Sequence, residues 1–111
     1  MKLFQRDIIL LPYPFTDLSG KKVRPALVIS NDDYNNETND CIMVPITSVI
    51  KDDPFSISLT QKDLEEGKLF KPSRIKFDKV FSLEKDLVIM KIGKLDSNVF
   101  KDIKKGVISL F

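Results

Sequence analysis

Short apolar runs separated by polar stretches set the expected architecture of the first half of the chain. Three of these runs predict buried strands, at residues 8–11, 26–30 and 41–46. Pro12 and Pro14 follow the first run and cannot donate to a sheet ladder, so the first strand should end there. Residues 16–22 collect turn formers and predict a hairpin loop, whereas the polar stretch 31–40 predicts a long surface loop.

Residues 54–59 alternate apolar side chains with serines, which is the period-two pattern of a strand with one buried face. The side chains expected on that buried face are Phe55, Ile57 and Leu59. Thr60 and Asp63 then have the spacing of an N-terminal helix cap. They predict a short helix through Leu64 and Glu66 that ends at Gly67.

Strand-like alternation returns at residues 73–81, and residues 87–92 predict a further strand. In the first of these segments the inward positions are Ile75, Phe77 and the less certain Phe81. The positions on its other face are Arg74, Lys76 and Asp78. Each alternation predicts a strand with one buried and one accessible face.

The last segment has helical spacing. Asp96 or Ser97 is suited to cap a helix whose apolar positions recur every three or four residues, at Val99, Ile103, Val107 and Leu110. Five or six short strands, one internal helical turn and this terminal helix together indicate a small, mainly β protein. We expect an antiparallel barrel or a strongly bent sheet.

Composition is consistent with one soluble globular domain spanning residues 1–111. The chain is 42% hydrophobic and 31% charged, and no apolar run approaches the roughly 20 residues that cross a bilayer. Arg6 and Asp7 interrupt the N-terminus before a signal peptide could form. We therefore expect a cytoplasmic protein that is not bound to a membrane.

The residue types present restrict the chemistry. The chain has no histidine, so it lacks the commonest general base and the commonest metal ligand. Cys41 is the only cysteine, which excludes an intrachain disulfide and a cysteine-based zinc cluster. The net charge of +2 is too small to identify a nucleic-acid binder by itself. Any catalysis must use Arg, Lys, Asp, Glu, Ser, Thr or Tyr.

Two segments carry the best candidates for such chemistry. Arg24 stands directly before Pro25 and a run of apolar residues, so its charge lies at the mouth of a buried strand. Thr47 and Ser48 follow the third predicted strand. Each candidate also has a purely structural interpretation. Arg24 can end a strand and extend to solvent, and the two hydroxyl residues can satisfy backbone groups in a turn.

These segments resemble the MazF/PemK family of toxins, which are sequence-specific, metal-independent ribonucleases. The resemblance is strongest from Asp7 to Ser30, which includes Arg24-Pro25, and in Val44-Pro45-Ile46-Thr47-Ser48. It continues more loosely through Lys71-Pro72-Ser73, Phe77-Asp78-Lys79 and Lys91-Ile92-Gly93-Lys94-Leu95. The family implies an SH3-like antiparallel barrel with a C-terminal helix.

The resemblance also implies roles for individual residues. Arg24 and Thr47 match the family's catalytic Arg and Thr, and Ser48 is a candidate second donor to the substrate. Further candidate substrate contacts are Lys76, Asp78, Thr16, Lys21 and Lys22. For Lys76, a role as an exposed strand charge is about as well supported. Arg6 departs from the family, because many relatives have Gly immediately before the Asp of the first strand.

The implied reaction is cleavage of single-stranded RNA by its own 2′-hydroxyl, without a cofactor or a metal. Arg suits this reaction because its guanidinium offers paired donors to phosphate and stays charged. The implied partners are a second copy of the chain and an acidic, partly disordered cognate antitoxin. Two alternatives stay open: a CcdB-like toxin that binds DNA gyrase on the same fold, and a degenerate relative that binds RNA without cleaving it.

Overall fold

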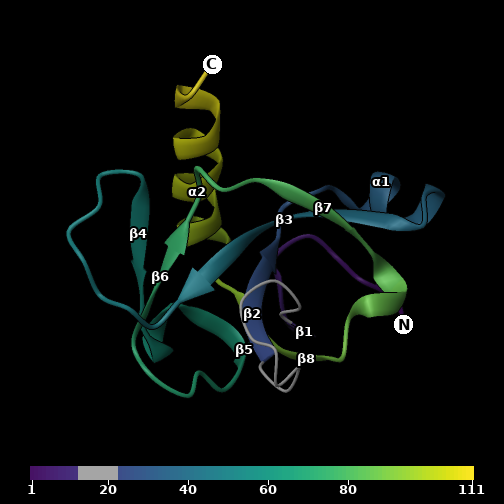
Figure 1. The fold of residues 1–111 in the computed structure, drawn as a ribbon, viewed down its shortest axis with the longest axis horizontal. Coiled ribbons are helices and arrows are strands. Elements are labelled where there is room, and N and C mark those ends of the chain that lie inside the picture. Colours follow the sequence, from purple (N-terminus) through teal and green to yellow (C-terminus); the bar gives the residue numbers. More distant parts are fainter. Residues whose placement is uncertain (13–22) are drawn as a thin grey trace.

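The computed structural model describes residues 1–12 and 23–111. Within these residues, eight strands form one antiparallel sheet in the order β4-β6-β3-β2-β1-β8-β5, with β7 also paired to β3 (Figure 1). The strands are β1 (Asp7–Pro12), β2 (Val23–Val28), β3 (Asp40–Thr47), β4 (Ser56–Leu59), β5 (Leu64–Gly67), β6 (Ser73–Lys76), β7 (Phe81–Glu84) and β8 (Met90–Leu95). The helices are α1 (Asp32–Glu37), η1 (Gln61–Asp63), η2 (Lys85–Leu87) and α2 (Ser97–Ser109), where η denotes a 3-10 helix.

Strand β3 makes the sheet curl, because it exchanges partners along its length. Its first half pairs with β7 from Asp40 to Met43, and its end pairs with β6 at Ile46 and Thr47. Its other edge pairs with β2. The sheet therefore wraps into a half-barrel, and α2 stands against one side of it (Figure 1). This arrangement confirms the expected mainly β fold with a bent antiparallel sheet and a C-terminal helix.

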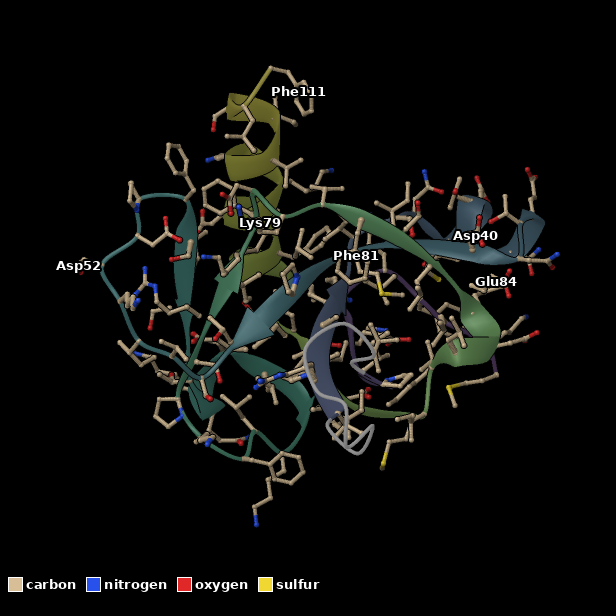
Figure 2. The ribbon with its side chains drawn as sticks, in the orientation of Figure 1. Asp40, Asp52, Lys79, Phe81, Glu84 and Phe111 are labelled. Carbon is tan, nitrogen blue, oxygen red and sulfur yellow. The ribbon has the colours of Figure 1, made fainter. Side chains whose placement is uncertain are left out.

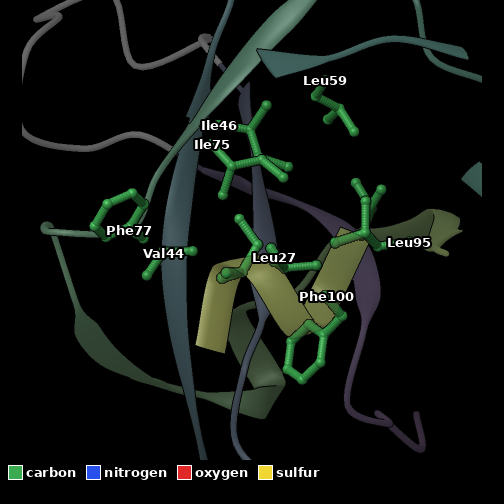
Figure 3. Close-up of a cluster of buried hydrophobic side chains, with 10 residues drawn as sticks. Leu27, Val44, Ile46, Leu59, Ile75, Phe77, Leu95 and Phe100 are labelled. Atoms are coloured by element: carbon green, nitrogen blue, oxygen red, sulfur yellow. The ribbon is translucent and has the colours of Figure 1, made fainter. Parts of the chain in front are cut away.

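The two faces of the central strands bury different hydrophobic clusters. On one face, the strand residues Ile8, Leu27 and Val44 pack with Phe100 and Ile103 of α2 (Figure 3). The residues of the opposite face form a second cluster, which includes Ile9, Ala26, Val28, Cys41 and Met43. Alternation along each strand produces this division, because successive side chains point to opposite faces. The predicted strands at 8–11, 26–30 and 41–46 are thus confirmed, with small shifts at their ends.

Helix α2 begins as the sequence suggested. Asp96 is the N-cap, and its carboxylate accepts hydrogen bonds from the backbone N–H groups of Asn98 at 3.0 Å and Val99 at 3.4 Å. The predicted apolar face is correct at the buried Ile103 and wrong at its end, where Leu110 is exposed. In the part of the chain that the structure describes, no helix combines the length and apolar character needed to span a membrane.

The polar stretch 31–40 was wrongly predicted to be a loop throughout, because it contains α1. Asn31 caps this helix by accepting a hydrogen bond from the backbone N–H of Tyr34 at 2.8 Å. Asn35 is buried, and its amide donates to the carbonyl of Ser30 at 2.9 Å. The helix therefore depends on caps and a buried amide, which an apolar pattern does not reveal.

The segment after β4 also differs from expectation. The Thr60–Asp63 capping box is confirmed, but it starts only the 3-10 turn η1, and residues 64–67 form β5 instead of a helix. Pairing with β8 overrides the local helical signal. The predicted burial of Phe55 is wrong as well. Its ring is half exposed and lies edge-on to the ring of Phe77, with centroids 6.4 Å apart.

Candidate active site

Three polar residues form a row across neighbouring strands. The pairs of β2 and β3 run Ala26↔Pro45, Leu27↔Val44 and Val28↔Met43, and two further steps in this register set Arg24 opposite Thr47. Thr47 is itself paired with Arg74 of β6. Paired residues project from the same face of a sheet, so Arg24, Thr47 and Arg74 share one face. We call these three residues the Arg24 row.

The Arg24 row lies at the end of the second hydrophobic cluster, on the face turned away from α2. Arg24 is two residues before the buried Ala26 on β2 and is paired with Leu11 of β1. Both Arg24 and Thr47 are half-buried. Strands on a shared sheet thus fix the backbone beneath each side chain, which is the kind of rigid support that positions catalytic groups.

Thr47 ends β3 and also supports the turn that follows. Its Oγ1 accepts a hydrogen bond from the backbone N–H of Val49 at 3.1 Å. The structural interpretation of Thr47 as a turn residue is therefore correct. A hydroxyl oxygen that accepts one bond can still donate its own proton, so the same side chain is able to serve a substrate oxygen. Ser48 follows directly and is half-buried.

The guanidinium of Arg74 makes two hydrogen bonds to the uncharged residue Ser56. Its Nε donates to Ser56 Oγ at 2.7 Å, and its Nη2 donates to the Ser56 carbonyl at 3.1 Å. Two bonds to one residue fix the plane of the guanidinium. Ser56 is buried, and its hydroxyl donates onward to the Asp53 carbonyl at 3.0 Å. Two hydrogen bonds to the uncharged Ser56 thus orient the guanidinium, and the Asp53 carboxylate is close enough for its pKa to be lowered by the charge of Arg74.

Lys76 occupies the same face of β6, but it is engaged elsewhere. Its ammonium forms an ion pair with Asp53 at 3.1 Å. The pKa of the Asp53 carboxyl lies below its usual value because it accepts a hydrogen bond from the backbone N–H of Phe55 and another from Lys76. Lys76 is therefore bound to an anion, whereas Arg74 is bound to neutral oxygens.

Asp78 follows β6 in a turn, and it is not paired with Lys76 as a unit. Its Oδ2 lies 3.9 Å from the ammonium of Lys79, which is labelled in Figure 2. Its Oδ1 is buried, and among residues 1–12 and 23–111 no donor reaches it. A buried carboxylate oxygen without a donor is uncommon in folded proteins.

The sequence led to Lys76 as a candidate and not to Arg74, whereas the structure pairs Arg74 with Thr47. The alternating pattern placed both on the outward face of the same strand, and only the pairing with β3 separates them. The residue type did favour Arg74 as a phosphate ligand, because Arg presents the paired donors that phosphate prefers. The other candidates Thr16, Lys21 and Lys22, and the predicted hairpin loop at 16–22, lie outside the described residues.

Cys41 is unsuited to act as a nucleophile. It is fully buried in the second hydrophobic cluster, and burial raises the pKa of its thiol, which disfavours the reactive thiolate. Among the residues that the structure describes, no group of three or more His, Cys, Asp or Glu side chains is arranged to hold a metal ion. The side chains of the Arg24 row offer guanidinium and hydroxyl donors.

Solved structures with the same fold include toxins and complexes of a toxin with its antitoxin. The chain is similar to a MazE–MazF complex from Deinococcus radiodurans, with a TM-score of 0.80, 22% identity, and coverage of 99% of this chain and 96% of that chain. It is also similar to an endoribonuclease in complex with its cognate antitoxin from a mycobacterial species (TM-score 0.76, 19% identity, 96% and 92% coverage). A third similar structure is the Mycobacterium tuberculosis toxin MazF-mt6 (TM-score 0.74, 16% identity, 94% of both chains).

At these identities the structural similarities establish the fold, which is that of the MazF class of small toxins. Sequence defines the family more closely. The family of PemK-like, MazF-like toxins of type II toxin–antitoxin systems has a characteristic sequence profile, and residues 4–111 match it. The chain therefore belongs to this family. No curated protein is significantly similar to the chain in sequence.

Proposed function

We propose that the protein is an endoribonuclease toxin that cleaves single-stranded RNA at specific sequences, using the 2′-hydroxyl of the substrate as the nucleophile. The observation that carries this proposal is the Arg24 row, in which two guanidinium groups flank a hydroxyl on one face of three adjacent strands. Attack by the 2′-hydroxyl places extra negative charge on the phosphate. Preorganised donors aimed at such developing charge are a major source of catalysis.

Each residue of the site has a separate proposed role in binding the phosphate. Arg24 stabilises the phosphorane-like transition state with its paired donors, and Thr47 fixes a phosphate oxygen with its hydroxyl. Ser48 supplies a second hydroxyl, and Arg74 holds an adjacent phosphate in the plane that Ser56 sets. The proposed contacts to the flanking nucleotides are Lys76, Asp78, Thr16, Lys21 and Lys22. Because the nucleophile belongs to the substrate, the reaction requires no metal or cofactor.

The proposed regulation follows from family membership. A toxin of a type II system needs a cognate antitoxin, and similar structures contain one. We propose that the partner is an acidic, partly disordered segment, because a cationic phosphate site also accepts carboxylates. We further propose that the toxin acts as a homodimer in the cytoplasm.

Cleavage in excess EDTA tests this function. We expect purified protein to cut single-stranded RNA under these conditions and to leave a 2′,3′-cyclic phosphate or 3′-phosphate and a 5′-hydroxyl. Mass spectrometry of the products identifies both ends. Activity that disappears with the chelator and returns with magnesium would contradict the proposed mechanism, and the Arg24→Ala protein controls for contaminating nucleases.

A further inference from the structure

A second cationic site lies away from the Arg24 row. It is a cavity of about 430 Å³ between the N-terminal segment, the start of β1, the end of β5 and β8. The residues that line it are Phe4, Asp7, Glu66, Gly67, Lys91, Ile92, Gly93 and Lys94. This volume is within the range of small-molecule sites. Three features of its walls indicate what it binds.

The first feature is a pair of ammonium groups held together by one carboxylate. Lys91 lies 3.1 Å from Asp7 Oδ2, and Lys94 lies 3.7 Å from Asp7 Oδ1. The backbone N–H of Phe4 also donates to Asp7 Oδ2, at 2.8 Å. Asp7 thus has three partners, while each ammonium has three donors and uses only part of its capacity on Asp7.

The second feature is the unequal exposure of these charges. The side chain of Asp7 is only 5% exposed, whereas those of Lys91 and Lys94 are 35% and 20% exposed. All three residues line the cavity, and the two ammonium groups are more accessible there than the carboxylate. The Phe4 ring is 4.9 Å from Lys91 Nζ and 5.5 Å from Lys94 Nζ, which further restricts both lysines.

The third feature is backbone strain beside the cavity. Arg6 has a φ of 79°, the left-handed region that favours Gly. It is held there by hydrogen bonds from its N–H to the Val28 carbonyl and from the Leu95 N–H to its own carbonyl, each 2.9 Å. This residue precedes Asp7, so the strained turn sets where the carboxylate stands. Strain of this kind concentrates at functional sites.

From these features we propose that the Asp7 pocket, defined by Asp7, Lys91, Lys94 and Phe4, binds a phosphate group. A phosphate offers several acceptor oxygens and is able to bind both ammonium groups at once. The group belongs either to a free nucleotide or to the backbone of an RNA chain. The proposal concerns binding alone and does not depend on the cleavage mechanism.

The acidic side chain of Glu66 at the cavity rim allows a second, opposite test of the proposal. Glu66 lines the cavity and is exposed, so it repels an incoming anion. Removing this charge should strengthen phosphate binding, whereas removing either lysine should weaken it. Opposite effects from neighbouring substitutions are difficult to obtain from a general loss of structure. Lys104, which is exposed on α2, provides a matched control.

The chain offers a convenient spectroscopic probe. It has four glycines, and Gly67 and Gly93 line the cavity whereas Gly106 lies in α2. Amide NMR spectra of the full chain should be recorded during titration with inorganic phosphate, with uridine monophosphate and with a 2′-O-methyl RNA oligonucleotide that cannot be cleaved. We expect the Gly67 and Gly93 signals to shift while that of Gly106 stays in place.

The variants then decide the proposal. Lys91→Gln and Lys94→Gln should each weaken binding roughly tenfold, the value of one charge-assisted hydrogen bond. Glu66→Gln should tighten it about two- to threefold, and Lys104→Gln should change nothing. Tight binding of the monophosphate supports a nucleotide ligand, and binding of the oligonucleotide alone supports an RNA backbone site.

Three results would overturn the proposal that the Asp7 pocket binds phosphate. Absence of Gly67 and Gly93 shifts with all three ligands would overturn the proposal, as would shifts that both lysine variants retain at full strength. Preferential binding of an acidic peptide would also overturn it, because the pocket would then recognise carboxylates. Thermal unfolding of each variant checks its fold, and the gain expected for Glu66→Gln gives a test that misfolding cannot produce.

Discussion

The Arg24 row and the Asp7 pocket both present pairs of cations, but they hold them in different ways. In the row, the guanidinium of Arg74 is oriented by the hydroxyl and carbonyl of Ser56, which carry no charge. In the pocket, the ammonium groups of Lys91 and Lys94 share the carboxylate of Asp7. Arg74 is thus oriented by uncharged dipoles, whereas Lys91 and Lys94 are oriented by an opposite charge.

This difference has a chemical consequence. An uncharged hydrogen-bond partner orients a cation without neutralising its charge, which suits the stabilisation of a charged transition state. A carboxylate partner neutralises part of that charge in the resting protein, which suits reversible binding of an anion. Substitutions that exchange the residue types between these two arrangements should therefore separate catalysis from binding.

The largest expected effect comes from removing the cation at Arg24. Arg24→Ala should lower the single-turnover rate of RNA cleavage on the order of 100- to 1,000-fold, about 3–4 kcal/mol of transition-state stabilisation. Arg24→Lys keeps the charge but loses the planar fork, so its residual rate measures geometry against charge. Circular dichroism should show a native fold for both. A wild-type rate for folded Arg24→Ala would remove Arg24 from the mechanism.

A smaller loss is expected at Thr47, because a hydroxyl carries no charge. Thr47→Ala should reduce the single-turnover rate by about 10- to 100-fold. Thr47→Ser retains the hydroxyl and should recover most of the rate. Because Thr47 Oγ1 also bonds to the backbone of Val49, a thermal unfolding curve of each variant is needed. Equal rates for the Ala and Ser proteins would show that the hydroxyl has no part in the reaction.

Exchanging the cation types on β6 tests the difference between an uncharged and a charged partner within one strand, because Arg74 bonds to Ser56 and Lys76 pairs with Asp53. Arg74→Lys should reduce kcat/KM roughly tenfold, since a lysine cannot make both bonds to Ser56. Lys76→Arg should change it little, because Arg is also able to pair with Asp53. Steady-state kinetics on one RNA substrate measure both. If the two exchanges had equal effects, the distinction between the neutral and the charged partner would be wrong.

The smallest effect concerns pH. The pKa of Asp53 is lowered in the folded protein, so its hydrogen bonds stabilise the fold above the ordinary carboxyl pKa, and this contribution is lost as pH falls through the lowered value. Asp53→Asn should therefore be slightly less stable than wild type at neutral pH, with a difference that shrinks in acid. Thermal unfolding across this range measures it. A difference that grew with acidity would contradict the assignment.

The features that sequence predicted well are those that local chemistry determines. Apolar runs bounded by proline located the central strands, and the carboxylate of Asp96 located the start of α2. Arg24 and Thr47 were identified by their motifs, and the strand register then set them opposite each other. Their catalytic roles stay predictions until the variants are measured.

Features that depend on distant pairing were not predictable. Arg74 and Lys76 have the same charge and the same strand face, and only the register between β3 and β6 places Arg74 opposite Thr47. Residues 64–67 became a strand because β8 lies beside them. In both cases a contact with a distant strand decided the outcome. Helix α1 was missed for another reason, because it depends on local polar bonds of Asn31 and Asn35 that an apolar pattern does not reveal.

Gly106 of α2 lies close to Phe77, the residue that follows β6, and so connects the helix with the strand that carries Arg74. A side chain at Gly106 would meet the ring of Phe77 at 2.9 Å, and Phe77 directly follows the strand that carries Arg74. Figure 3 shows this ring on the side of the sheet that α2 covers. Residue 106 therefore acts as a spacer between helix and strand. A larger residue at this position would push the Phe77 ring and the end of β6 away from α2.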